Sequence, residues 1–302
     1  MVPKGIWKAA ITMHTEIKQY SMFDKNTRAP RPLPPPNTCD GQFHIFGSYP
    51  PRPGAAYFAP EATITEALRM HKALGIERGV IVQSTAYGTD HRALLEALAI
   101  AGPNYRACGI VNESVSDSEL LKLHEAGIRG ARFNFNKMLN IFPQPEEFAR
   151  TVARVEELGW YIKLHCGANE LVELAPLFDP LTCTVVVDHM GRPEFAKGLK
   201  DPRLLQGLEF MKRPNWWMLV SNGDRRSQAG YPWDDAIPHA QAYIAAAPDR
   251  CIWATDWPHP LHTGKVPNDA ELLELFYRYT SDGTLRRKIL VDNPAVLFGF
   301  ST

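Results

Sequence analysis

Several short apolar runs of this sequence end abruptly in His or Asp, side chains that commonly move protons in enzymes. The clearest run spans 251–256 and ends in Asp256, which a tryptophan and a proline follow. Similar runs end at His165 and His189, and His44 closes the first strand-like segment. A carboxyl group at the end of a buried strand is unfavourable for folding and suited to general-base chemistry. We therefore predict that these four side chains share one active site.

The segments that must position these residues alternate between strand-like and helix-like patterns from residue 39 onward. Most of the strand-like runs lack period-two alternation, as expected for strands covered on both faces. They span 39–46, 79–83, 107–111, 130–135, 161–166, 184–189, 216–221 and 251–256. Helix-like segments at 63–74, 116–126, 146–158 and 269–280 separate several of them. About eight β/α repeats favour one (β/α)₈ barrel over 39–302, with a doubly wound sheet as the alternative.

The first 38 residues differ in composition from the barrel segment. The stretch 28–36 is rich in proline and favours a stiff, polyproline-like conformation. We predict that 1–38 forms an N-terminal arm, which lies over the barrel or over a neighbouring subunit of a homo-oligomer.

Composition excludes several classes of protein. The 302 residues carry a formal net charge of zero, so neither a nucleic-acid nor a membrane partner is expected. Apolar runs are only strand-length, and the N-terminus lacks a signal-peptide pattern. The five cysteines form no CxxC pair, as expected for buried thiols in a reducing compartment. We predict a cytoplasmic protein that binds a small molecule.

In a (β/α)₈ barrel the active site lies at the C-terminal ends of the strands and in the loops that follow. Polar residues near the other strand ends are therefore candidates for substrate binding. They are Gln42, Ser84, Tyr87, Arg132 and Arg225.

Six segments together resemble one branch of the amidohydrolase superfamily. They are Cys39-Asp40 with His44-Ile45-Phe46-Gly47, 86–90, 130–135, Asp188-His189-Met190-Gly191-Arg192-Pro193, 253–260 and Asn293-Pro294. The branch is that of the 2-pyrone-4,6-dicarboxylate lactonases, which includes sulfomuconolactone hydrolase and galactarolactone isomerase. The resemblance covers 39–299 and implies a (β/α)₈ enzyme acting on lactones without a metal or another cofactor.

The resemblance also implies roles for individual residues. Asp256 would be the general base that activates water, while His44 and His189 would polarise the lactone carbonyl. Arg132 and Arg225 would bind carboxylate groups of the substrate.

Three positions depart from the pattern of the branch. Gln42 replaces a histidine, as in galactarolactone isomerase; Met138, preceded by Lys137, replaces a second arginine; and His165 replaces a tyrosine. Loss of an arginine removes a bidentate carboxylate partner. We therefore expect a lactone with one carboxylate, or with differently spaced polar groups, in place of the pyrone dicarboxylate.

The sequence thus predicts a hydrolase that opens a carboxylate-bearing lactone. One alternative is lactone isomerisation, in which Asp256 deprotonates a substrate hydroxyl instead of water. A second is a hydrolase or decarboxylase with a single divalent metal such as Zn²⁺, held by His44, His165, His189 and Asp256. A neutral amide is a poor zinc ligand, so Gln42 favours the metal-free mechanism. A non-catalytic metabolite-binding protein is a further alternative.

Overall fold

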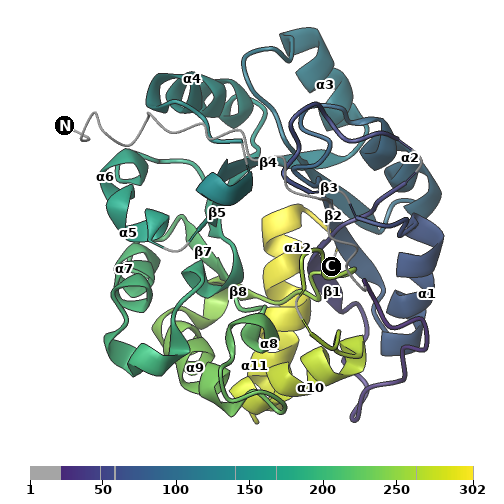
Figure 1. The fold of residues 1–302 in the computed structure, drawn as a ribbon, viewed down its shortest axis with the longest axis vertical. Coiled ribbons are helices and arrows are strands. Elements are labelled where there is room, and N and C mark those ends of the chain that lie inside the picture. Colours follow the sequence, from purple (N-terminus) through teal and green to yellow (C-terminus); the bar gives the residue numbers. More distant parts are fainter. Residues whose placement is uncertain are drawn as a thin grey trace.

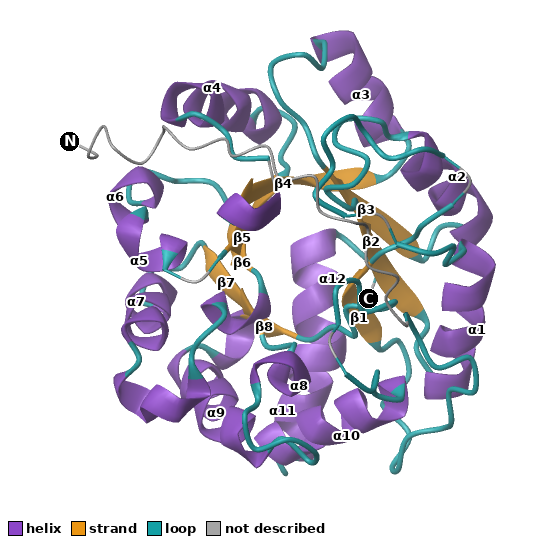
Figure 2. Cartoon of the chain, viewed as in Figure 1, coloured by secondary structure: helices purple, strands orange, loops and turns teal. Residues whose placement is uncertain are grey.

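The computed structural model describes residues 22–301 except Ser48, Phe58, Asn140, Ala168 and Thr263. Its centre is an eight-stranded parallel sheet in which each strand pairs with the next in chain order. The strands are β1 (Cys39–Phe43), β2 (Arg78–Val82), β3 (Tyr105–Gly109), β4 (Ile128–Phe135), β5 (Tyr161–Cys166), β6 (Val185–Val187), β7 (Trp216–Leu219) and β8 (Cys251–Ile252). They surround the centre of the molecule, with helices outside (Figures 1 and 2). The sequential order confirms the barrel, and the doubly wound alternative is wrong.

Backbone hydrogen bonds close the barrel between β1 and the chain that follows β8. Gly41 N donates to Trp253 O at 2.9 Å, and Asp256 N donates to Gln42 O at 3.0 Å. His44 N donates to Trp257 O at 2.7 Å. The strand ends were predicted too long, because the residues after Phe43 and Ile252 leave the regular ladder and turn toward the site.

The helices confirm the four predicted helical segments with shifts of one or two residues at their ends. The helix α1 begins with a capping box between Thr63 and Glu66 and ends at Gly75, whose φ is 77°. The helices are α1 (Ile64–Leu74), α2 (Arg92–Ala101), α3 (Asp117–Glu125), α4 (Pro145–Glu156), α5 (Glu170–Glu173), α6 (Ala175–Phe178), α7 (Pro202–Met211), α8 (Gly223–Arg226), α9 (Ile237–Ala246), α10 (Asp269–Tyr279), α11 (Gly283–Arg287) and α12 (Asn293–Phe298). Short helical turns are η1 (Lys137–Leu139), η2 (His189–Gly191), η3 (Phe195–Lys200), η4 (Asp234–Ala236), η5 (Pro248–Arg250) and the π-helical η6 (Lys288–Asp292).

The C-terminal segment closes one end of the barrel. Phe298 of α12 packs against Tyr161 at the start of β5, with ring centroids 5.5 Å apart. Arg78, at the start of β2, donates to Ser301 O at 2.6 Å. Figure 1 shows α12 behind the barrel centre. Because this plug covers the N-terminal ends of the strands, the functional site has only the opposite end available.

Part of the predicted arm is described. Phe23 packs against Trp257, with ring centroids 4.6 Å apart. Arg28 forms an ion pair of 2.6 Å with Glu274 of α10. Residues 1–21 lie outside the described residues, so the arm over 1–38 stays a prediction. Within the described part of the chain, no helix has the length and apolar character needed to cross a membrane.

Candidate active site

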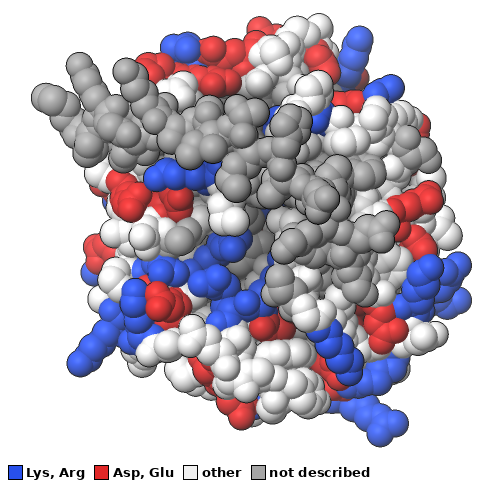
Figure 3. Space-filling model, viewed as in Figure 1, with Lys and Arg blue, Asp and Glu red and all other residues white. Residues whose placement is uncertain are grey.

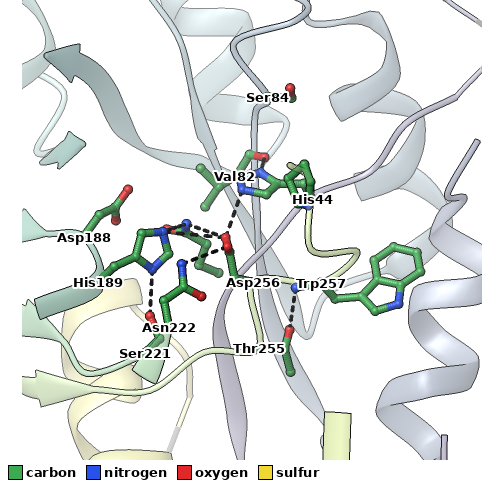
Figure 4. Close-up of polar contacts among 12 residues, drawn as sticks. His44, Val82, Ser84, Asp188, His189, Ser221, Asn222, Thr255, Asp256 and Trp257 are labelled. Atoms are coloured by element: carbon green, nitrogen blue, oxygen red, sulfur yellow. Dashed lines mark hydrogen bonds and ion pairs between the residues drawn. The ribbon is translucent and has the colours of Figure 1, made fainter. Parts of the chain in front are cut away.

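Four of the predicted residues meet at the C-terminal end of the barrel around the carboxylate of Asp256. His44 Nε2 lies 3.3 Å from Asp256 Oδ1, and His189 Nε2 lies 3.7 Å from the same oxygen. Gln42 Nε2 donates to this oxygen at 3.1 Å, while Asn222 Nδ2 donates to Oδ2 at 3.0 Å. In Figure 4 His44, His189 and Asn222 all point toward Asp256. A carboxylate so surrounded is held in one position.

The backbone is strained where it presents these side chains. Asp256 itself has a φ of 60°, a conformation that costs a non-glycine residue about 1–2 kcal/mol. Positive φ values also occur at the ends of the neighbouring strands, at His189 (51°), Met190 (57°), Arg192 (54°) and Asn222 (59°). Such strain concentrates at functional sites, where the surrounding structure must maintain it.

Hydrogen bonding assigns the protons of His189. The amide nitrogen of Gln42 lies 3.1 Å from His189 Nε2 and donates to Asp256, so its second hydrogen faces the ring nitrogen. Nε2 of His189 therefore accepts, and Nδ1 carries the hydrogen toward Ser221 Oγ at 2.8 Å. Burial lowers the pKa of His189 to about 4 despite the nearby carboxylates. His189 is thus neutral at physiological pH.

His44 is oriented by β2. Its Nδ1 lies 2.6 Å from the carbonyl oxygen of Val82, which can only accept, so Nδ1 carries a hydrogen. Its Nε2 faces Asp256 and can exchange a proton with that carboxylate. Burial raises the pKa of Asp256, but the amide donors of Gln42 and Asn222 and the nearby charge of Arg225 stabilise the carboxylate, and the pKa lies well below the ordinary range. Asp256 is therefore ionised at physiological pH.

His165 and Arg132 belong to a second buried network, centred on Asp188. The Arg132 Nη2 atom lies 2.9 Å from His165 Nδ1 and 3.3 Å from Asp188 Oδ2. The ammonium group of Lys163, fully buried, lies 2.9 Å from Asp188 Oδ1. Because a guanidinium only donates, the shorter contact makes Nδ1 of His165 an acceptor and leaves its hydrogen on Nε2. Burial and the charge of Arg132 lower the pKa of His165 to about 3.

A cavity of about 250 Å³ lies beside His189 and Asn222. Among the described residues, three arginines and one aspartate line it: Arg192, Arg225, Arg226 and Asp224. Asp224 faces His262, another lining residue, at 3.5 Å. Burial, together with the charges of Arg226 and Arg225, lowers the pKa of Arg192 to about 10. Lys and Arg side chains gather beside a hollow near the centre of the molecule in Figure 3. The cavity therefore suits an anionic ligand.

Arg225 connects this cavity with Asp256, since its Nε lies 3.9 Å from Asp256 Oδ2. Two other predicted binding residues lie apart from Asp256. Ser84 Oγ is hydrogen-bonded to the Tyr57 hydroxyl at 2.9 Å, and Ser84 stands well away from Asp256 in Figure 4. The Tyr87 hydroxyl accepts from Gly47 N at 3.1 Å. Substrate contacts for Ser84 and Tyr87 stay predictions.

Sequence reasoning did not select several residues that the structure places in the site. Arg192 and His262 line the cavity, and Lys163 neutralises Asp188. For Arg192 a signal was available, because it follows His189 in the motif 188–193. Lys163 lies within an apolar strand, and a buried charge needs a partner. The sequence therefore offered a signal for a buried acidic residue beside Lys163. Ser221 and His262 carry no such signal in the sequence.

The side chains present fit a divalent metal poorly. Among the described residues, the candidate ligand atoms within 4.8 Å of one another belong to His165, Asp188 and His189, so His44 and Asp256 do not join that cluster. Two cations, Lys163 and Arg132, already occupy Asp188. A metal ion there would be repelled by both charges, and Arg132 already contacts one ring nitrogen of His165.

The fold and these polar strand ends define a (β/α)₈ barrel with a cluster of ionisable side chains at the C-terminal ends of its strands. The family model described as amidohydrolase matches residues 34–300, and the chain belongs to this family. A 2-pyrone-4,6-dicarboxylate hydrolase of Comamonas testosteroni is 36% identical over 276 residues, covering 87% of this chain and 90% of that protein.

Other relatives carry related names. A 4-sulfomuconolactone hydrolase of Hydrogenophaga intermedia is 33% identical, covering 88% of this chain and 89% of that protein. A D-galactarolactone isomerase of Agrobacterium fabrum is 29% identical, with coverages of 90% and 94%. The crystal structure of a probable 2-pyrone-4,6-dicarboxylic acid hydrolase of Acinetobacter baumannii, with citric acid bound, gives a TM-score of 0.77 at 28% identity. That match covers 87% of this chain and all of the other, 100%.

Proposed function

We propose that this protein hydrolyses a carboxylate-bearing lactone. The observation that carries the proposal is the ionised Asp256, held among His44, His189 and Gln42 and directly beside an arginine-rich cavity. The names of two relatives, a pyrone dicarboxylate hydrolase and a sulfomuconolactone hydrolase, support an anionic lactone as substrate.

In the first step Asp256 takes a proton from water, and the resulting hydroxide attacks the lactone carbonyl carbon. The proton on Asp256 Oδ1 lies within reach of His44 Nε2, at 3.3 Å, which can accept it while Nδ1 stays bonded to Val82 O. Asn222 and Gln42 hold the carboxylate so that no reorganisation is needed during transfer. General-base catalysis of this kind contributes about 10²–10⁴-fold.

The developing oxyanion needs hydrogen-bond donors. His165 is neutral, and its Nε2 hydrogen is free of the contacts to Arg132 and Asp188 that engage Nδ1. Its ring packs edge-to-face on that of His189, with centroids 5.9 Å apart, and His189 in turn contacts Asp256. We assign His165 as an oxyanion donor, a role worth about 3–4 kcal/mol for a well-placed group. The ester oxygen leaves as an alkoxide or enolate and takes the proton that the base removed.

The substrate carboxylate would bind at Arg225 and Arg192. Arg225 donates to Pro260 O at 2.6 Å, which fixes its guanidinium between the cavity and Asp256. Arg132 has the same charge but faces Asp188, so the geometry favours Arg192 over Arg132 as the second anion contact.

A second candidate is isomerisation of a sugar-acid lactone. It is favoured by Gln42, whose Oε1 is buried and has no hydrogen-bond partner among the described residues. A neighbouring hydroxyl group of the substrate could donate to this oxygen while Asp256 removes the proton of the attacking hydroxyl. The D-galactarolactone isomerase among the relatives supports this alternative.

One experiment separates these reactions. The purified protein is incubated in H₂¹⁸O with a panel of carboxylate-bearing lactones, and products are followed by NMR and mass spectrometry. Hydrolysis incorporates one ¹⁸O atom into an open-chain acid, whereas isomerisation gives a new lactone without label. Turnover of no lactone, with tight binding of the same compounds, would indicate a binding protein.

A further inference from the structure

A buried aspartate behind the site lies outside the proposed chemistry. Asp40 of β1 is 0% exposed, and no arginine or lysine pairs with it among the described residues. His71 of α1 donates from Nε2 to Asp40 Oδ2 at 3.1 Å, and the Tyr105 hydroxyl lies 3.0 Å from His71 Nδ1. A carboxyl group buried so deeply must be held by hydrogen bonds, and the first of these comes from helix α1.

The other bonds of Asp40 cross the junction that closes the barrel. Oδ1 accepts from Gln42 N at 3.1 Å and from Thr255 N at 3.0 Å. Oδ2 accepts from the Thr255 hydroxyl at 2.5 Å. The Thr255 oxygen in turn accepts from Trp257 N at 3.0 Å, a bond that Figure 4 shows. The carboxylate of Asp40 therefore binds Thr255 directly, and the Thr255 hydroxyl extends this network to Trp257.

These bonds act at the point where the backbone is strained. Asp256 has a φ of 60°, and its own N–H is bonded to Gln42 O at 3.0 Å. Since β8 ends at Ile252, the ladder with β7 does not fix the conformation of residues 255–257. The Asp40–Thr255 bonds take the place of that ladder and orient the carboxylate of Asp256.

We propose that Asp40, acting through Thr255, is the positioning residue that holds Asp256 in its catalytic orientation, with His71 fixing Asp40. The inference rests on the proposed function of Asp256 as base. Loss of this positioning should lower the rate strongly, because a shift of a catalytic group by about 1 Å can cost 100-fold in rate.

The test is a set of kinetic constants for Asp40→Asn, Thr255→Val and Thr255→Ser. In Asp40→Asn an NH₂ group replaces one oxygen and meets the His71 N–H and the Thr255 hydroxyl, so the clamp loosens. We expect kcat to fall about 10–100-fold with KM changed less than about twofold. Thr255→Val removes the hydroxyl at constant shape and should likewise lower kcat with little change in KM. Thr255→Ser keeps the hydroxyl, so its kcat should be at least about tenfold higher than that of Thr255→Val.

Asp201 offers a matched control. It is also 0% exposed and bonded to backbone N–H groups, those of Glu194 and Arg203, but it lies at the start of α7 away from Asp256. Asp201→Asn should lower stability while kcat per folded molecule stays unchanged. If Asp40→Asn and Thr255→Val behave like Asp201→Asn, the positioning role is wrong.

Two further outcomes are decisive. If Asp40→Asn does not fold, the contrast between Thr255→Val and Thr255→Ser carries the test alone, and equal kcat values would overturn the inference. If the wild type turns over no lactone, the proposed function fails on its own. Crystal structures of the Thr255 variants then decide, because an Asp256 φ that stays near 60° without the hydroxyl contradicts positioning by this network.

Discussion

At the scale of single residues, hydrogen bonds to neighbouring groups determine which ring nitrogen of each histidine in the site carries a hydrogen. The sequence predicts Asp256, His44, His165 and His189 as one group because each ends a strand of the same barrel. It does not predict that Arg132 turns to Asp188, since that pairing depends on the register of β4 against β5 and β6. Arg192 lies in a motif that the sequence singles out, but only the fold shows that its side chain lines the cavity.

The two arginines should respond differently to substitution. Arg192→Met removes a charge that faces the cavity, so KM should rise about 10–100-fold, as expected for charge-assisted bonds of about 1.5–3 kcal/mol. Arg132→Met leaves Asp188 with Lys163 as its remaining cation and should chiefly lower the free energy of unfolding. Steady-state kinetics and urea titration of both variants check this. A KM effect confined to Arg132→Met would place the anion site at β4 instead.

At the scale of elements, the junction of β1 with the chain after β8 decides where the base stands. The sequence locates all eight strands, since buried parallel strands read as short apolar runs. It overestimates the last one, because the residues after Ile252 bond to β1 backbone and to Asp40 in place of a regular ladder. Local sequence carries no information on such a long-range closure.

Gly41 makes this junction possible. A Cβ at Gly41 would meet Trp253 O at 2.8 Å, so Gly41→Ala must push β1 away from the β8 segment. We expect a loss of stability of about 1–3 kcal/mol and a fall in kcat larger than the loss of folded protein explains. Gly283→Ala is the control, because a Cβ there contacts nothing within 4 Å. Urea titration and steady-state kinetics of both variants check this. Equal free energies of unfolding and equal kcat values for the two variants would show that the junction tolerates movement.

At the scale of the whole molecule, α12 plugs one end of the barrel and the functional residues gather at the other. The compartment and the oligomeric state stay predictions, as does the role of the N-terminal arm. Metal independence is also a proposal, supported by the cations on Asp188. Exhaustive chelation should leave turnover unchanged. Loss of turnover on chelation, with recovery on addition of Zn²⁺, would contradict metal independence.

Acid should destabilise the protein through its neutral buried histidines. The pKa values of His165, about 3, and His189, about 4, lie below the ordinary value of 6.5, so the unfolded chain binds more protons below pH 6.5. The free energy of unfolding therefore falls with decreasing pH, by about 1.4 kcal/mol per pH unit for each such histidine. Urea titrations between pH 6 and pH 4 should give a shallower slope for His165→Asn than for wild type. Identical slopes would mean that His165 is protonated in the folded state.

The central claim is that Asp256 is the base. Asp256→Asn keeps the shape of the side chain, and its amide oxygen can still accept from Asn222, but it cannot take the proton from water. We expect a folded variant that still binds the lactone and whose kcat is about 1,000-fold lower, in line with general-base losses of about 10²–10⁴-fold. The measurement is kcat on the lactone identified from the panel, with circular dichroism and ligand binding on the same samples. A near-normal kcat would contradict the account and mean that another group is the base.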